Sequence, residues 1–388
     1  MRQDEKRTFK SEEYVPSRSI VTRYNRAKNS LFPPLLSARA KKLPPYHKPL
    51  VQDAHNLPQG LTLGSREHAL YLFFLCIYMK GGINSEVAIV QLSKLYIDCP
   101  EIFMPESLHG LEVYEIEWVI EWLGQTLSHY GLGSNVEDSK KSWVWNSVKL
   151  ARFWNCDPRL LFSEAEQNAD IAWQSYDAAK ENYDSLCRRI MRRPGMSLEK
   201  MLSQPSGFYG FQHKMVSMII YFYVHAGIIK SIPYPVPVDF HILRVLISTG
   251  VLSIRRRSSK RWGTRYWEYR EKFLPHAREI TLRYVVEERA NPQHLADVLW
   301  LLSRSWCRHH PGNKSSVDKT RRGRKRVIKD IDVVWNKQSE RRYDRTCGRC
   351  PVESMCSFNI PSSYYYVKGG IALRSRRANP PQYKLSLF

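Results

Sequence analysis

Apolar segments with helical spacing occupy most of the chain between residues 61 and 306. In about ten such segments, apolar side chains recur every three or four residues, which is typical of helices packed around a core. Residues 67–80, EHALYLFFLCIYMK, are apolar on most faces and predict a buried helix, and residues 169–191 predict another helix. No convincing run of strands precedes residue 360. The pattern therefore predicts an all-α, mainly helical fold.

The charge balance of the chain points to a polyanionic partner. Among 388 residues, 60 are Lys or Arg and 37 are Asp or Glu, which gives a formal net charge of +23. A surplus of this size attracts phosphate backbones, and a charged but inert surface is the alternative. The hydrophobic fraction of 43% suffices for a sizeable core, and the length allows roughly two or three compact units.

The sequence also predicts a cytoplasmic chain without a membrane span. It has no apolar run of about 18 residues, and the first residues, MRQDEKRTFKSEEY, lack the apolar region of an export signal. Eight cysteines in such a chain are expected to be thiols or metal ligands and not disulfides.

Composition divides the chain into four segments. Residues 1–60 are basic and Pro-rich, and we expect a partly irregular arm that drapes over a partner. The helical core follows at 61–306, and a cysteine-bearing loop occupies 307–358. The tail, 359–388, contains YYYVKGGIALRSRR, which predicts a small β-hairpin around Gly369-Gly370.

Two basic stretches are candidate nucleic-acid contacts. Residues 255–272, RRRSSKRWGTRYWEYREK, mix cations with aromatic residues, and residues 319–329, KTRRGRKRVIK, form a concentrated cationic run. Such segments follow a phosphate backbone, and solvated loops are the alternative for each. In the second run the candidate DNA contacts are Arg321, Arg322, Arg324 and Lys325.

The cysteines near the C-terminus have the spacing of a metal site. CGRCPVESMC places Cys347, Cys350 and Cys356 in a C-x2-C-x5-C pattern, in which two thiolates share a tight turn and a third lies within reach. Cys307, at the end of a predicted helix, supplies a fourth. Four thiolates suit an iron–sulfur cluster or zinc, and spacing does not separate the two. The other cysteines lie in or beside apolar segments and are expected to be buried thiols: Cys76, Cys99, Cys156 and Cys187.

The cysteine loop resembles that of the endonuclease III family, the helix–hairpin–helix DNA glycosylases that hold a [4Fe–4S] cluster. The family pattern is C-x6-C-x2-C-x5-C, and its last three positions match this chain. Cys307 matches the first position in context, but 39 residues instead of six separate it from Cys347. The resemblance implies a [4Fe–4S] cluster on the four cysteines and an insertion that contains residues 319–329. His309 or His310 is the alternative first ligand.

A second match concerns the proposed catalytic carboxylate. Residues 237–250, PVDFHILRVLISTG, resemble the family segment V-D-T-H-V-x-R-V, and Asp239 occupies the position of its essential aspartate. A carboxylate beside the sugar stabilises the positive charge that develops at C1′ as the N-glycosidic bond stretches. An ordinary helix N-cap is the alternative for Asp239. For His241, which matches the family histidine, the resemblance implies a structural role.

A third match is GFYGFQHKMVSMII, which resembles the family hairpin G-x-G-x-K at the start of a helix. Gly210 fits the first glycine, and Gln212 replaces the second. Such a hairpin directs backbone N–H groups at a DNA phosphate, and His213 is a further candidate contact. Lys214 falls on the nucleophilic lysine, whose amine attacks C1′. A phosphate-facing surface lysine is the alternative.

Two further similarities are short. The 24 residues between Lys214 and Asp239 are closer to the spacing of archaeal 8-oxoguanine glycosylases, which also use G-F-x-x-K and V-D-F-H. Residues 80–87, KGGINSEV, align with the family segment that enters the gap left by an extruded base. Ile83 or Asn84 is the candidate plug, and a plain helix cap is the alternative.

The end of the chain resembles a protein-binding motif. Leu385-Ser386-Leu387-Phe388 is similar to the bacterial sliding-clamp motif Q-L-S/D-L-F, with Lys384 where Gln is usual. Leu and Phe on such a tail fit a preformed pocket, and an accidental apolar terminus is the alternative. The resemblance makes the bacterial sliding clamp a candidate partner.

The matches follow the family's order over roughly residues 62–358. They imply a DNA glycosylase with AP-lyase activity, a monomer that binds double-stranded DNA in a cleft between two helical subdomains. Three alternatives remain: a monofunctional glycosylase, a non-catalytic iron–sulfur DNA-binding module, and a zinc-bound interaction protein. No feature of the sequence indicates which base is excised.

Overall fold

The computed structural model describes a mostly helical chain, as the sequence predicts. Among the helices that the structure describes, none is both long and apolar enough to cross a membrane. The described residues are 20–40, 57–79, 85–108, 110–111, 113–133, 136–254, 270–303, 350–356, 364–367 and 370–373. Several predicted positions lie outside them: Ile83, Asn84, Cys307, His309, His310, Arg321, Arg322, Arg324, Lys325, Cys347 and the tail 385–388.

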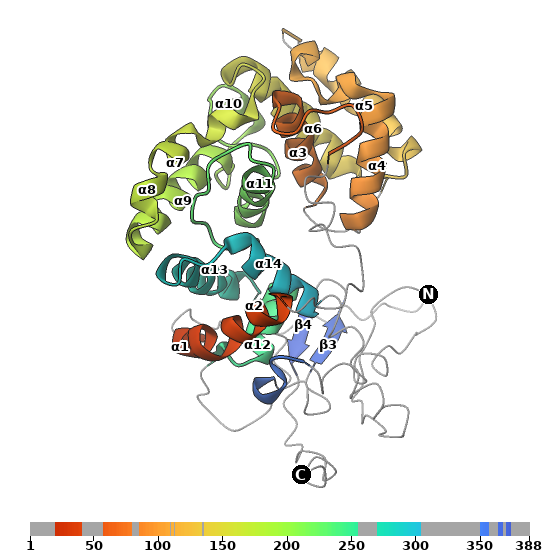
Figure 1. Cartoon of the computed structure of the whole chain (residues 1–388). Helices are drawn as coiled ribbons and strands as arrows, with labels where there is room; N and C mark the ends of the chain where they lie inside the picture. The colour runs from red at the N-terminus through yellow and green to blue at the C-terminus, as the bar shows by residue number, and fades with distance from the viewer. Residues whose placement is uncertain are drawn as a thin grey trace, which may run out of the picture. The chain divides into compact units, whose positions relative to one another are not determined.

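The chain divides into two compact units (Figure 1). The first comprises Met1–Leu31, Leu243–Ala277 and Cys307–Phe388, and the second comprises Phe32–Ile242 and Arg278–Trp306. The predicted helical core, 61–306, is therefore shared between the two units.

Most of the described helices lie in the second unit, and α12 and α13 contribute residues to both units. Residues 169–191 form two helices instead of the single one predicted, because the Ser175 side chain caps α9 by accepting the Ala178 N–H at 3.2 Å. In chain order the helices from α2 onwards are α2 (Phe32–Ala40), α3 (Arg66–Tyr78), α4 (Ser85–Asp98), η3 (Pro100–Phe103), η4 (Pro105–Leu108), α5 (Val113–His129), α6 (Val136–Phe153), η5 (Pro158–Phe162), α7 (Ser163–Gln167), α8 (Ala169–Ala172), α9 (Tyr176–Ile190), α10 (Leu198–Leu202), α11 (His213–His225), α12 (Phe240–Ser248), α13 (Arg270–Glu287) and α14 (Pro292–Leu301).

A short pair of strands lies in the first unit, where the sequence shows no convincing run of strands. Strand β1 (Ile20–Thr22) pairs antiparallel with β2 (Leu252–Ile254), and Val21 lies opposite Ser253. Three residues are too few to show an alternating pattern, so this pair could not be predicted from periodicity. In the tail, β3 (Tyr364–Val367) pairs antiparallel with β4 (Gly370–Leu373), which confirms the predicted hairpin.

Part of the predicted N-terminal arm is folded. After β1 come α1 (Tyr24–Arg26) and a π-helical turn, η2 (Ala27–Leu31). Ala27 and Leu31 are fully buried, and α2 then begins with Phe32, whose ring lies edge-on to Tyr284 at 4.6 Å. The two prolines after Phe32 lie in the first turn of α2, where their missing N–H groups cost nothing. Residues 20–40 are therefore folded, and contact of the arm with a partner stays a prediction.

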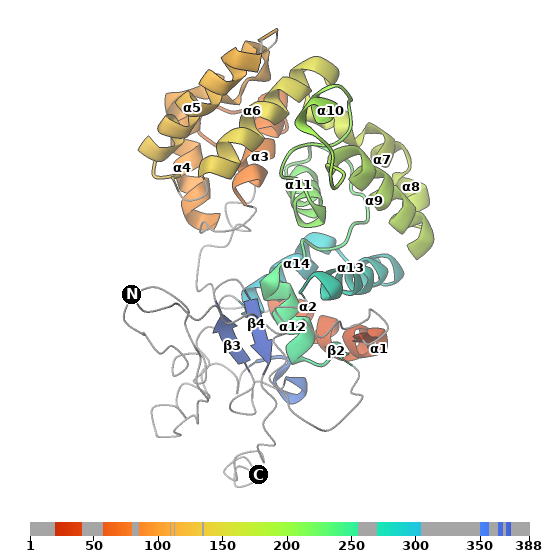
Figure 2. The ribbon, with the colours of Figure 1, turned by 180° about the vertical axis from the view of Figure 1, so that it is seen from behind.

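Helix α3 is the buried helix that the sequence predicts. The Ser65 side chain caps it by accepting the His68 N–H at 3.1 Å. All of its residues from His68 to Tyr78 are buried, so every face of the helix contacts protein. Figures 1 and 2 show α3 beside α4, α6 and α11, the helices against which it packs.

Aromatic rings fill the core around α3. Phe74 stacks on Trp143 of α6, with ring centroids 4.4 Å apart and planes at 13°. The preceding residue, Phe73, stacks on Phe211 at 5.0 Å and meets the Phe208 ring edge-on at 5.7 Å. Phe208 and Phe211 flank the predicted hairpin glycine, so the core of this unit anchors that hairpin directly.

Candidate functional site

The chain between α10 and α11 has the backbone of a tight hairpin. Gly207 and Gly210 adopt φ values of +86° and +78°, a region that favours glycine. Gly210 is the predicted first hairpin glycine. Gln212, which replaces the second glycine, has a φ of −131°, which any residue adopts. This backbone therefore needs no glycine at position 212.

A buried lysine is hydrogen-bonded to the backbone of this segment. Lys149 of α6 is fully buried, and its Nζ donates to the carbonyls of Met201 at 2.5 Å, Ser206 at 2.6 Å and Gly207 at 2.8 Å. Burial lowers the pKa of Lys149 to about 8, so the side chain is mostly an ammonium at pH 7. Each of its three N–H groups then has a carbonyl acceptor. The sequence pattern does not indicate this role for Lys149, since a lysine in a helical segment normally reaches solvent.

Asn146, one turn before Lys149, secures the next part of the hairpin. Its Nδ2 donates to the Tyr209 carbonyl at 3.0 Å, and its Oδ1 accepts the Tyr209 N–H at 2.7 Å. Asn146 is fully buried, so the side-chain amide replaces a backbone pairing inside the core. Together the two α6 side chains make five hydrogen bonds to residues 201–209.

Lys214 lies in the first turn of α11, immediately after the hairpin. Its side chain is half-buried, and Nζ donates to the carbonyl of Met79 at 2.8 Å. Met79 directly follows α3 and directly precedes residues 80–84, the predicted base-gap segment, which lies outside the described residues. Burial raises the pKa of the Cys76 thiol, and the nearby charge of Lys214 opposes that rise. The amine therefore sits at the C-terminal end of α3.

The His213 ring faces the protein and not a solvent-exposed surface. It stacks on Tyr183 of α9, with centroids 6.1 Å apart, and its Nδ1 lies 3.4 Å from the Cys187 sulfur. Burial, and then the charge of Arg278, lower the pKa of His213 to about 4. At neutral pH the ring is uncharged, so we expect no ionic contact between it and a phosphate.

Asp239 caps α12, as the alternative interpretation of this residue predicts. Its Oδ1 accepts the N–H groups of His241 at 2.8 Å and Ile242 at 3.0 Å. The side chain is half-buried. Within the part of the chain that the structure describes, the second oxygen, Oδ2, takes part in no hydrogen bond. Capping thus occupies one oxygen and fixes the direction of the other.

Helix α14 links the two predicted catalytic positions. Two turns beyond the lysine in α11, the Tyr221 hydroxyl donates to Asp297 of α14 at 2.8 Å. Two residues after the aspartate, His241 Nδ1 lies 3.0 Å from the Ser303 hydroxyl, just past the end of α14. His241 is buried, in agreement with the structural role implied for it. Helix α14 and the residue just past it therefore contact α11 two turns beyond Lys214 and α12 at its second residue.

Two of the four predicted cluster ligands fall in the described residues. Cys350 and Cys356 are half-buried and flank a short 3-10 turn, η9 (Glu353–Met355). The Glu353 N–H donates to the Cys350 carbonyl at 3.1 Å, and the Cys356 N–H donates to the Glu353 carbonyl at 3.2 Å. This turn brings both thiols to one short segment, which fits a shared metal centre. Among the described residues no group of three or more His, Cys, Asp or Glu side chains gathers as metal ligands, so the cluster stays a prediction.

The remaining cysteines are free thiols. Cys76, Cys156 and Cys187 are buried and Cys99 is half-buried. The expectation of buried thiols is therefore confirmed for three of the four, and Cys99 is only partly buried.

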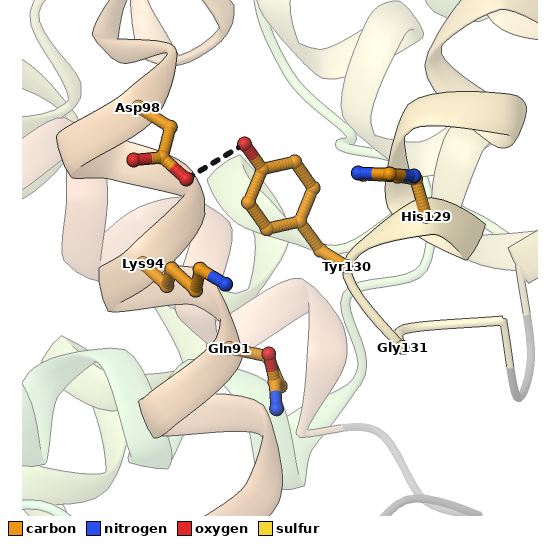
Figure 3. A pocket seen from close by; sticks show the side chains of 6 residues that line it. All are labelled: Gln91, Lys94, Asp98, His129, Tyr130 and Gly131. Carbon is orange, nitrogen blue, oxygen red and sulfur yellow. Dashed lines mark hydrogen bonds between the residues drawn. The ribbon is translucent and has the colours of Figure 1, made fainter.

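A separate polar hollow of about 330 Å³ lies at the end of α4 (Figure 3). The Tyr130 hydroxyl donates to Asp98 Oδ2 across it at 2.8 Å. That hydrogen bond raises the pKa of Tyr130 to about 12. Neither Lys214 nor Asp239 lines the hollow, so it is not part of the candidate catalytic site. Its lining residues are Gln91, Lys94, Asp98, His129, Tyr130 and Gly131.

The residues 207–210, Lys214 and Asp239, which the sequence singles out, all belong to the second unit. The described residues that the prediction missed are Asn146 and Lys149, which hold the hairpin in place. No protein-family model and no curated protein sequence matches the chain. Its function is therefore inferred from these residues and their contacts.

Proposed function

We propose that the chain is a DNA glycosylase of the helix–hairpin–helix type, which flips a base out of duplex DNA and releases it. Its AP-lyase activity then cleaves the strand at the resulting abasic sugar. One observation carries the proposal. Lys214 follows the turn at Gly210 at the start of α11, and Asp239 caps the next helix, α12. Helix α11 is hydrogen-bonded to α14 through Tyr221, and α12 contacts Ser303, just past α14, through His241. An amine and a carboxylate on one rigid support are the two groups that such a reaction needs.

The proposed reaction begins at C1′ of the extruded nucleotide. The Lys214 ammonium releases the Met79 carbonyl and loses a proton, and the neutral amine forms a bond to C1′ as the N-glycosidic bond breaks. The base leaves with the electrons of that bond and takes up a proton. The C1′–O4′ bond then opens to give an imine with Nζ. Loss of a C2′ proton expels the 3′ phosphate and cleaves the strand.

Asp239 has two tasks in this proposal. Its capped oxygen holds the carboxylate against the first turn of α12. Its other oxygen stabilises the positive charge that develops on the sugar, and it passes protons between the amine and the leaving base. A carboxylate fixed by two backbone N–H groups needs little reorganisation during the reaction.

The proposal also includes the remaining predicted partners. Cys307, Cys347, Cys350 and Cys356 would hold a [4Fe–4S] cluster that fixes the loop carrying residues 319–329 against duplex DNA. The net charge of +23 supports a DNA partner. The tail motif supports attachment to a bacterial sliding clamp, in a cytoplasmic, nucleoid-associated monomer.

One contact favours the monofunctional alternative. The Lys214 amine donates to the Met79 carbonyl at 2.8 Å, and an amine held there helps to fix the end of α3. In a monofunctional enzyme this would be its whole role, and a water molecule would attack C1′ instead.

The test uses duplexes that each carry one damaged or modified base, with released bases identified by mass spectrometry and enzyme–DNA adducts trapped by borohydride. We expect base release and a trapped adduct from the wild type, and no adduct from Lys214→Gln. The matched control is Lys230→Gln, an exposed lysine just beyond α11, which should still be trapped. Base release by Lys214→Gln at the wild-type rate would establish the monofunctional alternative. DNA binding without base release from any duplex would leave only a DNA-binding module.

A further inference from the structure

Three large aromatic side chains on α5 project into solvent. Tyr114, Trp118 and Trp122 are 73%, 70% and 42% exposed. Their spacing of four residues places them on one face of the helix. The opposite face, which includes Ile116 and Ile120, is buried and packs on α6. The exposed aromatics therefore have no role in the core of this unit.

Carboxylates lie between these aromatic rings. Glu117 and Glu121 are both exposed and share the face of the helix with Trp118 and Trp122. Glu121 accepts a hydrogen bond from Lys140 of α6 at 2.7 Å, and its side chain remains 69% exposed. We call Tyr114, Glu117, Trp118, Glu121 and Trp122 the α5 face.

The α5 face is held on a fixed support. The packing on α6 secures the length of the helix. At its C-terminal end, the hydrogen bond from Tyr130 to Asp98 ties it to α4 (Figure 3). There, Lys94 Nζ lies 5.9 Å from the centre of the Tyr130 ring, beside that same carboxylate. At this end of the helix, the Tyr130 ring, which is bonded to the Asp98 carboxylate, thus already contacts the cation of Lys94.

We propose that the α5 face binds an Arg- and Lys-bearing segment of a partner protein. A guanidinium or ammonium group stacks on an indole and pairs with the carboxylate beside it, and the alternation of Glu and Trp offers such places in succession. Exposed Trp and Tyr are the residues that contribute most to protein interfaces. Duplex DNA does not fit this face, because its phosphates would meet the carboxylates. A second α5 face does not fit either, because like charges would oppose each other.

The experiment selects twelve-residue peptides from a random displayed library on the immobilised full-length protein. Peptides that also bind a Glu117→Lys/Trp118→Ala double variant are removed. The matched control is Asp170→Lys/Ile171→Ala, an exposed acidic–apolar pair of neighbours on α8. We expect the retained peptides to be enriched in Arg and Lys. We also expect each single variant, Glu117→Lys and Trp118→Ala, to weaken their binding at least about tenfold, while the α8 control binds as the wild type does.

Three results would overturn the proposal. One is that the retained peptides lack basic residues, or bind the single variants Glu117→Lys and Trp118→Ala as tightly as they bind the wild type. Another is a wild-type dimer in sedimentation that dissociates on Trp118→Ala, which would make a second copy the occupant. The last is a carbodiimide cross-link within one chain between Glu117 and a lysine of 319–329, which would make the occupant the chain's own basic run. None of these results depends on whether the protein excises bases.

Discussion

At the scale of single residues, the hairpin depends on one buried charge. Lys149 donates to three backbone carbonyls, and its hydrogen bonds to Met201 and Gly207 are buried. Leaving a buried carbonyl without a donor costs about 1–3 kcal/mol, and removing the buried charge offsets part of that cost. We expect Lys149→Met to lower the free energy of unfolding by about 2–3 kcal/mol in urea, and to speed amide exchange in residues 206–210. Lys141→Met, an exposed lysine on the same helix, should change neither.

The same residue gives the protein a defined pH dependence. Its pKa is about 8 in the folded state and near the usual 10.5 in the unfolded state. Between pH 8 and pH 10.5 the unfolded chain binds more protons than the folded chain, so the free energy of unfolding rises with pH over this range. The same stability is lost as the pH falls from 10.5 to 8. We expect the free energy of unfolding of the wild type, relative to Lys149→Met, to increase from pH 8 to pH 10. A difference that stays flat over this range would contradict the assignment.

Capping and catalysis by Asp239 are separable by substitution. Asparagine caps a helix about as well as aspartate but carries no charge. We expect Asp239→Asn to unfold within a few tenths of a kcal/mol of the wild type, and to lose at least about 100-fold in base release. Asp239→Ala should lose activity and also about 1 kcal/mol of stability. Asp157→Asn, which alters the aspartate that caps η5, should keep the activity. Full activity in Asp239→Asn would show that Asp239 caps the helix and takes no part in base release.

The sequence predicted residues whose roles are local and missed those whose roles are tertiary. The cap at Asp239 and the glycine at 210 follow from their immediate neighbours in the chain. Asn146 and Lys149 contact residues more than 50 positions away, and nothing in the local pattern of α6 shows those partners. The contact of Lys214 with Met79, 135 positions apart, was missed for the same reason.

At the scale of elements, long amphipathic helices were predictable and short elements were not. Helix α3 was evident from its unbroken apolar run, and the break before α9 depends on one capping serine, Ser175. The pair β1–β2 joins two three-residue segments that are more than 200 positions apart. Such strands form only after the rest of the chain has brought them together.

The hairpin between α10 and α11 is the element whose geometry the proposed function needs most. We expect Gly210→Ala to cost about 1–2 kcal/mol, because L-residues are strained at a φ of +78°. Gly227→Ala, at a φ of +67° just past α11, should cost about the same, since a Cβ there meets no atom within 4 Å. In a fluorescence anisotropy titration, only Gly210→Ala should weaken binding to duplex DNA. Equal affinity of both variants would separate the hairpin from DNA binding.

At the scale of the whole molecule, the helical class followed from sequence periodicity, and the division into two units did not. The first unit gathers three stretches that are far apart in the chain, Met1–Leu31, Leu243–Ala277 and Cys307–Phe388. Composition shifts mark linkers along the chain, and they carry no information on which distant stretches assemble. The predicted cluster cysteines fall in this unit, and the candidate catalytic residues Lys214 and Asp239 fall in the second.

That placement makes the cluster testable by its removal. We expect the purified wild type to be brown, to absorb visible light and to contain about four irons and four sulfides per chain. Cys350→Ser and Cys356→Ser should lose colour and iron together and melt at lower temperature, because a ligand is lost from a shared centre. Cys187→Ser, a buried thiol outside the loop, should keep the iron. A colourless wild type that carries one zinc per chain would instead establish a zinc site on the same cysteines, and it would leave the proposal for Lys214 and Asp239 to stand on its own test.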